Sequence, residues 1–227
     1  MIIDLSHPII DGMPAYPGLP PAEVGMVRTH EQSRELYDGQ AEFAISRFVL
    51  VGNVGTYLDS PYHRFCQAPD IADLRLEDLV DLDAIVVDVE PLAGRAIDIT
   101  ASPDLLAGRA VLIRTGWDRH WGTPAYWNPG PYLSDTAIQR LVDAEVALVG
   151  VDCSNIDDPH DPRRPAHTTL LGCEIPVVEH LRRLDALPGD GFRFSALPLP
   201  IVGAASCPIR AYATIPAGPP HIERNTP

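Results

Sequence analysis

The feature of this sequence that most restricts its fold is a series of five short apolar runs, rich in β-branched residues. Each run ends near a polar residue or a glycine, which is typical of strands that are buried in a sheet. The predicted strands are 43–51, 84–89, 110–113, 146–151 and 192–202.

One amphipathic helix is predicted between the third and fourth apolar runs. It begins after the N-cap residue Ser134 and extends to Ala144. Its apolar face consists of Ala137, Ile138, Leu141 and Val142. Shorter helices are expected at 102–108, 168–171 and 177–184. Because strands outnumber helices, the sequence indicates an α/β fold with a mixed sheet. The 24 prolines and 17 glycines are spread evenly, so we expect a single domain over 1–227.

Charge and composition exclude several classes of function. The chain has 31 acidic and 17 basic residues, and its net charge of -14 disfavours nucleic acid as a partner. Every basic residue is an arginine, so a Schiff-base lysine or a phosphate-binding loop ending in lysine is impossible. No apolar run approaches the length of a membrane span, and the four cysteines have no paired spacing. We expect a cytoplasmic protein that binds no membrane.

The segment 52–63 contains the residues best suited to chemistry. Asp59 and His63 are four positions apart, and turns at Gly55 and Pro61 would let the carboxylate and the imidazole converge. A carboxylate there can bind a cation or orient an imidazole, which exchanges protons near neutral pH. On spacing alone, a structural hydrogen-bonding role is the alternative.

The same segment resembles the signature of the cyclase family of kynurenine formamidase-like hydrolases, His-x-Gly-Thr-His-x-Asp-x-Pro-x-His. Matching positions are Gly55, Thr56, Asp59, Pro61 and His63. Further blocks resemble the family in the same order, at 3–18, 112–117, 150–157, 167–179 and 196–210. The resemblance implies a swivelling β/α/β domain, a homodimer or homotetramer, and a zinc or manganese ion that activates water to open an amide or lactone.

The resemblance also implies which residues would form the site, and two of them depart from the family. The family's first two signature histidines are Asn53 and Tyr57 here, whereas Asp59 and His63 are retained. The downstream metal ligands fall on His167 and Glu179. An asparagine carbonyl is a weak ligand, and a tyrosine ligates well only as phenolate. The sequence therefore predicts a degenerate metal site.

Two mechanisms remain open for this site. In the first, Asp59, His167 and Glu179 hold one divalent ion, and this oxygen-rich set favours manganese or magnesium over zinc. In the second, which we favour from the sequence, no metal binds and His63 and Tyr57 act with the carboxylates as an acid–base site. Asn53 would then donate a hydrogen bond to the substrate carbonyl.

Arg114 and Trp117 are the remaining candidates for substrate binding. Arg114 would fix a substrate carboxylate, with pairing to an internal acid as the structural alternative. Trp117 would help to wall an aromatic pocket, and packing under a long loop is its alternative.

The sequence thus predicts an enzyme of the arylformamidase type that hydrolyses a small-molecule amide or lactone. His63 would be the general acid or base, and Asp59 would lie beside it. One alternative is a metal-independent lyase or cyclase of small-molecule (secondary) metabolism. The other is a catalytically silent family member that binds a small ligand.

Overall fold

The body of the molecule is built on one mixed sheet. The computed structural model describes residues 1–89 and 94–216. The sheet order is β1-β12-β11-β5-β7-β9-β10-β4, and a further pairing between β12 and β4 closes it into a barrel. Strands β5, β7, β9 and β10 run parallel, whereas the other pairs are antiparallel. The strand bounds are Ile2–Asp4 (β1), Tyr57–Asp59 (β4), Leu82–Asp88 (β5), Ala110–Arg114 (β7), Leu148–Val151 (β9), Val177–Glu179 (β10), Phe192–Pro198 (β11) and Ser206–Thr214 (β12). The predicted α/β class with a mixed sheet is confirmed.

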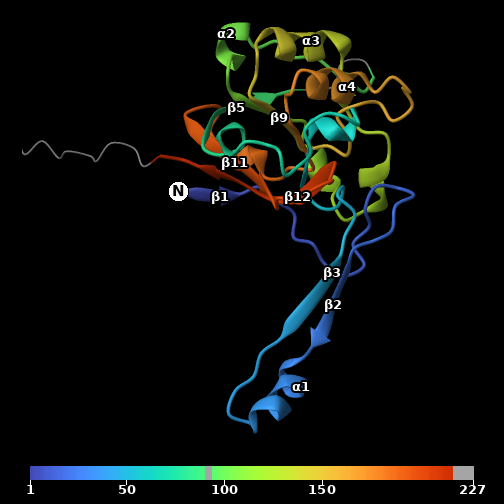
Figure 1. Cartoon of the computed structure of the whole chain (residues 1–227). Helices are drawn as coiled ribbons and strands as arrows, with labels where there is room; N and C mark the ends of the chain where they lie inside the picture. The colour runs from blue at the N-terminus through green and yellow to red at the C-terminus, as the bar shows by residue number, and fades with distance from the viewer. Residues whose placement is uncertain (90–93, 217–227) are drawn as a thin grey trace, which may run out of the picture.

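Three helices gather on one side of the sheet, at the top of Figure 1: α2 (Pro103–Leu106), α3 (Asp135–Asp143) and α4 (Pro165–Gly172). The backbone N–H of Ala137 donates to the Ser134 side chain at 3.0 Å, which caps α3 as predicted. Ile138 and Leu141 are buried against the sheet. The short helix expected at 102–108 is α2, and the one expected at 168–171 is part of α4.

The core lies on both faces of the parallel strands. In β7, Val111 and Ile113 pack with the helices, whereas Leu112 belongs to a second apolar cluster that also contains Phe192 and Phe194. Successive side chains of a strand point to opposite faces. A strand covered on both faces therefore reads as a continuous apolar run, and this is why β5, β7 and β9 were predictable.

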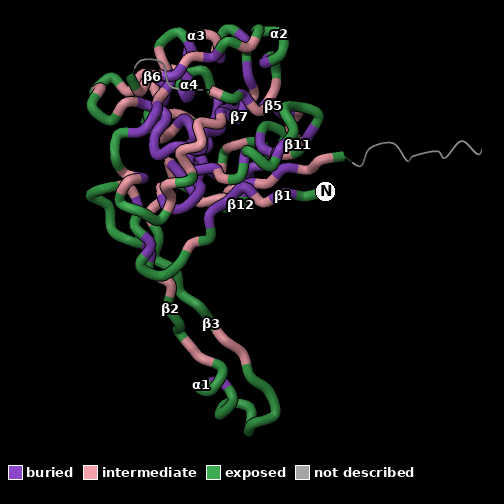
Figure 2. Tube along the Cα trace, turned by 180° about the vertical axis from the view of Figure 1, so that it is seen from behind, coloured by how far each residue is buried: buried purple, intermediate pink, exposed green. Residues whose placement is uncertain are grey.

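An extension leaves this body, and we call residues 23–50 the arm. It contains β2 (Glu23–Arg28), α1 (His30–Arg34), the 3-10 turn η1 (Glu35–Tyr37) and β3 (Ile45–Val49). Figures 1 and 2 show that it projects away from the barrel and is largely exposed. The strand predicted at 43–51 is confirmed as β3, but all five of its residues are exposed.

Smaller elements line the loops of the body. They are the two-stranded parallel pair β6 (Ala96–Ile97) and β8 (Tyr132–Leu133), and the 3-10 turns η2 (Pro61–His63), η3 (Leu76–Asp78), η4 (Trp117–His120), η5 (Pro124–Trp127) and η6 (Leu184–Ala186). Within the described residues, no helix is both long and apolar enough to cross a membrane.

The helix predicted at 177–184 is wrong, because Val177–Glu179 form strand β10. This strand pairs with β9 on one side and β4 on the other, and its three residues are buried. Two sheet partners therefore override a local pattern that also suits a helix. The strand expected at 192–202 ends earlier, at Pro198.

Candidate active site

Two neighbouring strands and two short helical segments bring the candidate residues together. Tyr57 and Asp59 are two positions apart on β4, so their side chains share a face. Glu179 of β10 is the direct cross-strand partner of Tyr57. His63 ends the turn η2, and His167 lies in α4. The sheet thus joins the segment 52–63 to a histidine more than 100 residues away.

Three buried side chains form the centre of this cluster. His167 Nε2 lies 3.5 Å from Asp59 Oδ2 and 3.7 Å from Glu179 Oε1. The His167 side chain is 4% exposed, and those of the two acids are at most 1% exposed. The structure therefore brings together the three metal ligands proposed from the sequence.

His63 borders the same centre from its more open side. Its Nδ1 lies 3.6 Å from Asp59 Oδ1, and its side chain is 30% exposed. Ser206 Oγ lies 3.3 Å from the same nitrogen and donates a hydrogen bond to Asp59. Two oxygens thus orient the most accessible imidazole of the cluster.

The residues that replace the two signature histidines are part of this network. The Tyr57 hydroxyl donates a hydrogen bond to Glu179 Oε2. The Asn53 amide donates to Asp59 Oδ1 at 3.5 Å and to Ser206 Oγ at 3.3 Å. Both residues therefore donate to carboxylates of the centre, either directly or through Ser206.

Asp157 fixes the orientation of His167. One Asp157 oxygen lies 2.6 Å from His167 Nδ1 and accepts from the His167 backbone N–H at 3.2 Å. The other oxygen accepts from the Ala166 N–H at 2.6 Å, at the first turn of α4. With Nδ1–H donated to Asp157, Nε2 faces Asp59 and Glu179.

The pKa shifts follow from this crowding of acids around imidazoles. Burial lowers the pKa of His167, but the charge of Glu179, the hydrogen bond to Asp157 and the Asp59 carboxylate 3.5 Å away outweigh it and raise that pKa to about 10. Burial lowers the pKa of His63, against the opposing effect of Asp59. Burial, together with the charges of Glu179 and Asp59, raises the pKa of Tyr57 well above its ordinary value. Tyr57 is therefore a neutral phenol.

The donor set fits a divalent cation. Asp59 Oδ2 is fully buried and accepts no hydrogen bond from the described residues. Asp59, His63 and His167 each offer a ligand atom, and these atoms lie within 4.8 Å of one another. Both Glu179 oxygens already accept hydrogen bonds, from the Tyr57 hydroxyl and from the Ile156 N–H at 2.6 Å. A buried carboxylate oxygen without a hydrogen-bond partner, facing an oriented imidazole, is the arrangement that a bound metal ion needs.

A cavity of about 200 Å³ opens onto the cluster. Its lining residues are Tyr16, Leu19, Asn53, Tyr57, His63, Asn155, Arg164, His167 and Glu179. Two substrate-binding candidates lie elsewhere. Arg114 lines another cavity and is ion-paired with Asp88, whereas Trp117 donates from Nε1 to the Tyr126 carbonyl at 3.1 Å. Neither of them lines the cavity beside His63.

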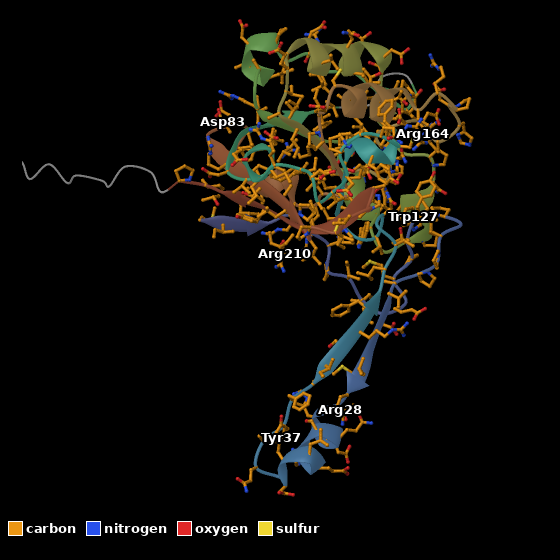
Figure 3. All side chains as sticks on the ribbon, in the orientation of Figure 1. Arg28, Tyr37, Asp83, Trp127, Arg164 and Arg210 are labelled. Carbon is orange, nitrogen blue, oxygen red and sulfur yellow. The ribbon has the colours of Figure 1, made fainter. Side chains whose placement is uncertain are left out.

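Three functional candidates were not predicted from the sequence: Ser206, Asp157 and Arg164. Arg164 precedes α4 with a left-handed backbone (φ 49°), and its guanidinium donates to Asn155 Oδ1 at 2.9 Å beside the cavity. Figure 3 labels Arg164 at the edge of the body. The sequence offered a weak signal for Asp157 and Ser206, because both stand inside blocks that match the family.

Comparison with known proteins supports the resemblance seen in the sequence. The Cyclase family model matches residues 3–158. Kynurenine formamidase from Geobacillus thermodenitrificans is 28% identical over 210 residues, covering 92% of this chain and 95% of that protein.

Solved structures agree in fold. An isatin hydrolase bound to the product analogue thioisatinate has a TM-score of 0.76 at 24% identity, with 95% of this chain and 92% of that chain covered. A structure described as a predicted metal-dependent hydrolase from Bacillus stearothermophilus has a TM-score of 0.68 at 22% identity, with 94% and 97% covered. With the family model matching more than half of its length, the chain belongs to the cyclase family.

Proposed function

We propose that this chain is an amide-hydrolysing enzyme of the arylformamidase type, acting on a small carbonyl compound in the cavity beside His63. The observation that carries the proposal is the convergence of Asp59, His63 and His167 at that cavity. The names of the relatives, kynurenine formamidase and isatin hydrolase, support an amide over a lactone.

His63 is the residue that moves the proton. As general base it takes a proton from the attacking water, and as general acid it returns a proton to the leaving nitrogen, so that the amide becomes a carboxylate and an amine. Asp59 and Ser206 hold the ring through contacts at Nδ1, which leaves Nε2 for the substrate.

The geometry supports the metal-assisted mechanism over the metal-free one preferred from the sequence. A divalent ion held by Asp59 Oδ2 and His167 Nε2, beside Glu179, would supply a Lewis acid for the scissile carbonyl. His167 must give up the Nε2 proton to bind it, while Asp157 keeps the Nδ1 proton in place. Asp59 offers a carboxylate oxygen, which suits manganese and magnesium, and His167 offers an imidazole nitrogen, which suits zinc, so manganese, magnesium and zinc are all candidates.

A second candidate arrangement makes His63 a metal ligand. It is favoured by the short separation among the ligand atoms of Asp59, His63 and His167. The two arrangements differ in one measurable property, the metal content of His63→Ala. If His63 is only an acid–base group, this variant retains the metal of the wild type; if His63 is a ligand, the variant loses it.

Arg164 extends the proposal to the substrate. Its side chain is 22% exposed and lines the cavity; within the described residues it makes one side-chain hydrogen bond, to Asn155, and an ion pair with Asp157 at 3.8 Å. Its planar guanidinium is suited to a carboxylate or another anionic group. We assign Arg164, and no longer Arg114, to the binding of such a group on the substrate.

Three wider expectations are retained as part of the proposal. The first is that 1–227 is a single cyclase-like domain, and the second is that its sheet and helices form the swivelling β/α/β arrangement of the family. The third is a cytoplasmic location. The match to cyclase-family structures over 95% of the chain supports the first two.

The test is turnover of formanilide and isatin by protein loaded with Mn²⁺, Zn²⁺ or Mg²⁺ after chelation. We expect hydrolysis that falls by about 10²–10⁴-fold in His63→Ala, whereas the exposed His160→Ala retains it. Wild-type turnover that needs no metal would support the metal-free mechanism. If neither substrate is turned over but each still shifts the melting temperature of the protein, the catalytically silent ligand-binding alternative is favoured.

A further inference from the structure

Two side-chain amides line the cavity beside His63, those of Asn53 and Asn155. The Asn53 amide nitrogen donates to Asp59 Oδ1 at 3.5 Å and to Ser206 Oγ at 3.3 Å, so both of its N–H groups are engaged. The Asn155 amide nitrogen donates no hydrogen bond within the described residues, and it is not sealed from solvent. The free amide donor in the wall of this cavity therefore belongs to Asn155.

The oxygen end of the Asn155 amide is held by two donors. The Arg164 guanidinium donates to Asn155 Oδ1 at 2.9 Å, and the Asp157 backbone N–H donates to the same oxygen at 2.9 Å. A flipped amide would turn an N–H group toward both donors, so these contacts define which end is the oxygen. The nitrogen is the end that remains for a ligand.

The loop that carries Asn155 is fixed as well. It follows strand β9, and the hydrogen bond from the Asp157 N–H to the side chain two residues before it is an Asx-turn. The Cys153 thiol donates to the Asn155 carbonyl at 3.3 Å, and Asn155 is buried. A side chain that is held at its backbone and at its oxygen loses little further freedom when its nitrogen meets a ligand.

The contact with Arg164 also strengthens the free donor. A guanidinium that donates to the oxygen of an amide polarises it, and this makes the N–H groups of that amide better donors. Such a donor suits an oxygen that gains negative charge. In the hydrolysis of an amide this is the carbonyl oxygen, which becomes an oxyanion as water adds to the carbonyl carbon.

The size of the cavity brings the substrate carbonyl near this donor. A volume of about 200 Å³ is smaller than the pockets of about 300–1,000 Å³ that hold drug-sized ligands. A substrate amide that lies against His63 therefore has its carbonyl group in the same small volume as the Asn155 amide. The Tyr57 hydroxyl also lines this cavity, but it already donates to Glu179.

We propose that Asn155 is a catalytic residue whose Nδ2 donates a hydrogen bond to the carbonyl oxygen of the scissile amide and stabilises the negative charge that develops there. This role rests on the proposed hydrolytic function, and it is the one that the sequence suggested for Asn53. A carbonyl oxygen has two lone pairs, so the hydrogen bond is compatible with both the metal-assisted and the metal-free mechanism. No covalent bond to Asn155 forms or breaks.

The first experiment compares Asn155→Asp with the wild type on formanilide. The new carboxylate keeps an oxygen for the Arg164 guanidinium and the Asp157 N–H, but it has no amide donor. Formanilide has no anionic group, so its turnover does not depend on an anion bound by Arg164. We expect kcat to fall about 10²–10³-fold, with bound metal and melting temperature retained. Asn128→Asp, the same change at an exposed asparagine, retains kcat.

Asn155→Ser is the second variant, and it serves if Asn155→Asp does not fold. A hydroxyl at this position can still accept from the Asp157 N–H, whereas the amide donor is lost, so the same fall in kcat is expected. A kcat within about threefold of the wild type in either folded variant would overturn the proposed role. A fall in kcat that accompanies loss of the bound metal would overturn it too, because Asn155 would then support the metal site and not the substrate.

Binding of formanilide, measured by calorimetry, separates a failure of this role from a failure of the hydrolytic function. If the wild type binds formanilide without turning it over, the hydrolytic function fails. The hydrogen bond from Asn155 to the carbonyl is then supported if Asn155→Asp weakens binding by about tenfold or more, and it is overturned if binding is unchanged. A wild type that neither binds nor hydrolyses formanilide would also overturn it.

Discussion

The candidate active site in the barrel and the arm differ in which side chains they bury. In the active site, the ionisable side chains of Asp59, His167 and Glu179 are almost completely buried. On the arm, the apolar side chain of Phe48 is 63% exposed. Both regions depart from the usual distribution of side chains, in opposite directions. Buried charges are tolerated where partners compensate them, and exposed apolar faces where another surface covers them. The compensation at the barrel is within the chain, whereas no surface among the described residues covers the apolar face of the arm.

The largest contrast is expected from two phenylalanines. Phe194→Ala removes a fully buried ring from the core and should lower the free energy of unfolding by about 3–5 kcal/mol. Phe48→Ala on the arm should change it by no more than about 0.5 kcal/mol in dilute protein, and a cost that grows with protein concentration would show that a second chain covers this side chain. Denaturant titrations at several concentrations measure both. A concentration-independent loss of several kcal/mol for Phe48→Ala would mean that the arm packs within one chain.

The next effect concerns the support of the buried site. Asp157→Asn leaves the His167 ring without its carboxylate partner at Nδ1. Metal affinity, measured by competition with a chromophoric chelator, should fall about 10–100-fold, whereas Asp161→Asn, at a half-buried acid of the same loop that pairs with Arg163, should retain it. An Asp157→Asn protein with unchanged metal affinity and unchanged turnover would show that His167 is not positioned this way.

Tyr57 and Tyr126 are both buried, but only the Tyr57 hydroxyl has a hydrogen-bond partner among the described residues. Tyr57→Phe leaves Glu179 Oε2 without its donor, and we expect a loss of about 1–3 kcal/mol in the free energy of unfolding. The Tyr126 hydroxyl is buried and has no partner among the described residues. Tyr126→Phe should therefore be neutral or stabilising. Thermal unfolding of the two variants side by side is the measurement, and equal destabilisation would contradict this difference.

The smallest effect is a dependence of stability on pH. Burial, with smaller contributions from the charges of His180 and Arg182, lowers the pKa of His7 to about 3. A lowered pKa means that folding favours the neutral ring, so its contribution is complete above pH 6.5 and is lost as the pH falls toward 3. At pH 5.5 the expected cost is about 1.4 kcal/mol. His7→Phe, which keeps a ring stacked on Trp121, should make this part of the pH profile less steep, with the part due to the buried His180 remaining, whereas the exposed His160→Phe should not change it.

Much of the barrel was predictable because its central strands are covered on both faces. The apolar runs of β5, β7 and β9 and the Ser134 cap of α3 are local signals that the packing does not overrule. Strand β10 was mistaken for a helix because its structure depends on β9 and β4, which are distant in sequence. The exposure of β3 could not be predicted either, because an apolar strand has the same sequence pattern whether or not its own chain covers it.

The site was predictable to the extent that family motifs mark its residues. Asp59, His63, His167 and Glu179 were placed together because the resemblance named them, and the structure brings them into contact. Arg114 was assigned to it because a charged residue ends a central strand, but β7 is separated from β10 by β9 and faces another cavity. Arg164 was missed because no local pattern reports which loop turns toward His63.

We propose above all that the cluster of Asp59, His63 and His167 is a metal-assisted hydrolytic centre. Its most direct test measures bound metal and formanilide hydrolysis on the same samples of wild type, His63→Ala and His167→Ala. We expect about one bound ion and turnover in the wild type, one bound ion with turnover lowered by about 10²–10⁴-fold in His63→Ala, and neither in His167→Ala. Wild-type turnover in protein stripped of metal, or turnover in His63→Ala as fast as in the wild type, would contradict it.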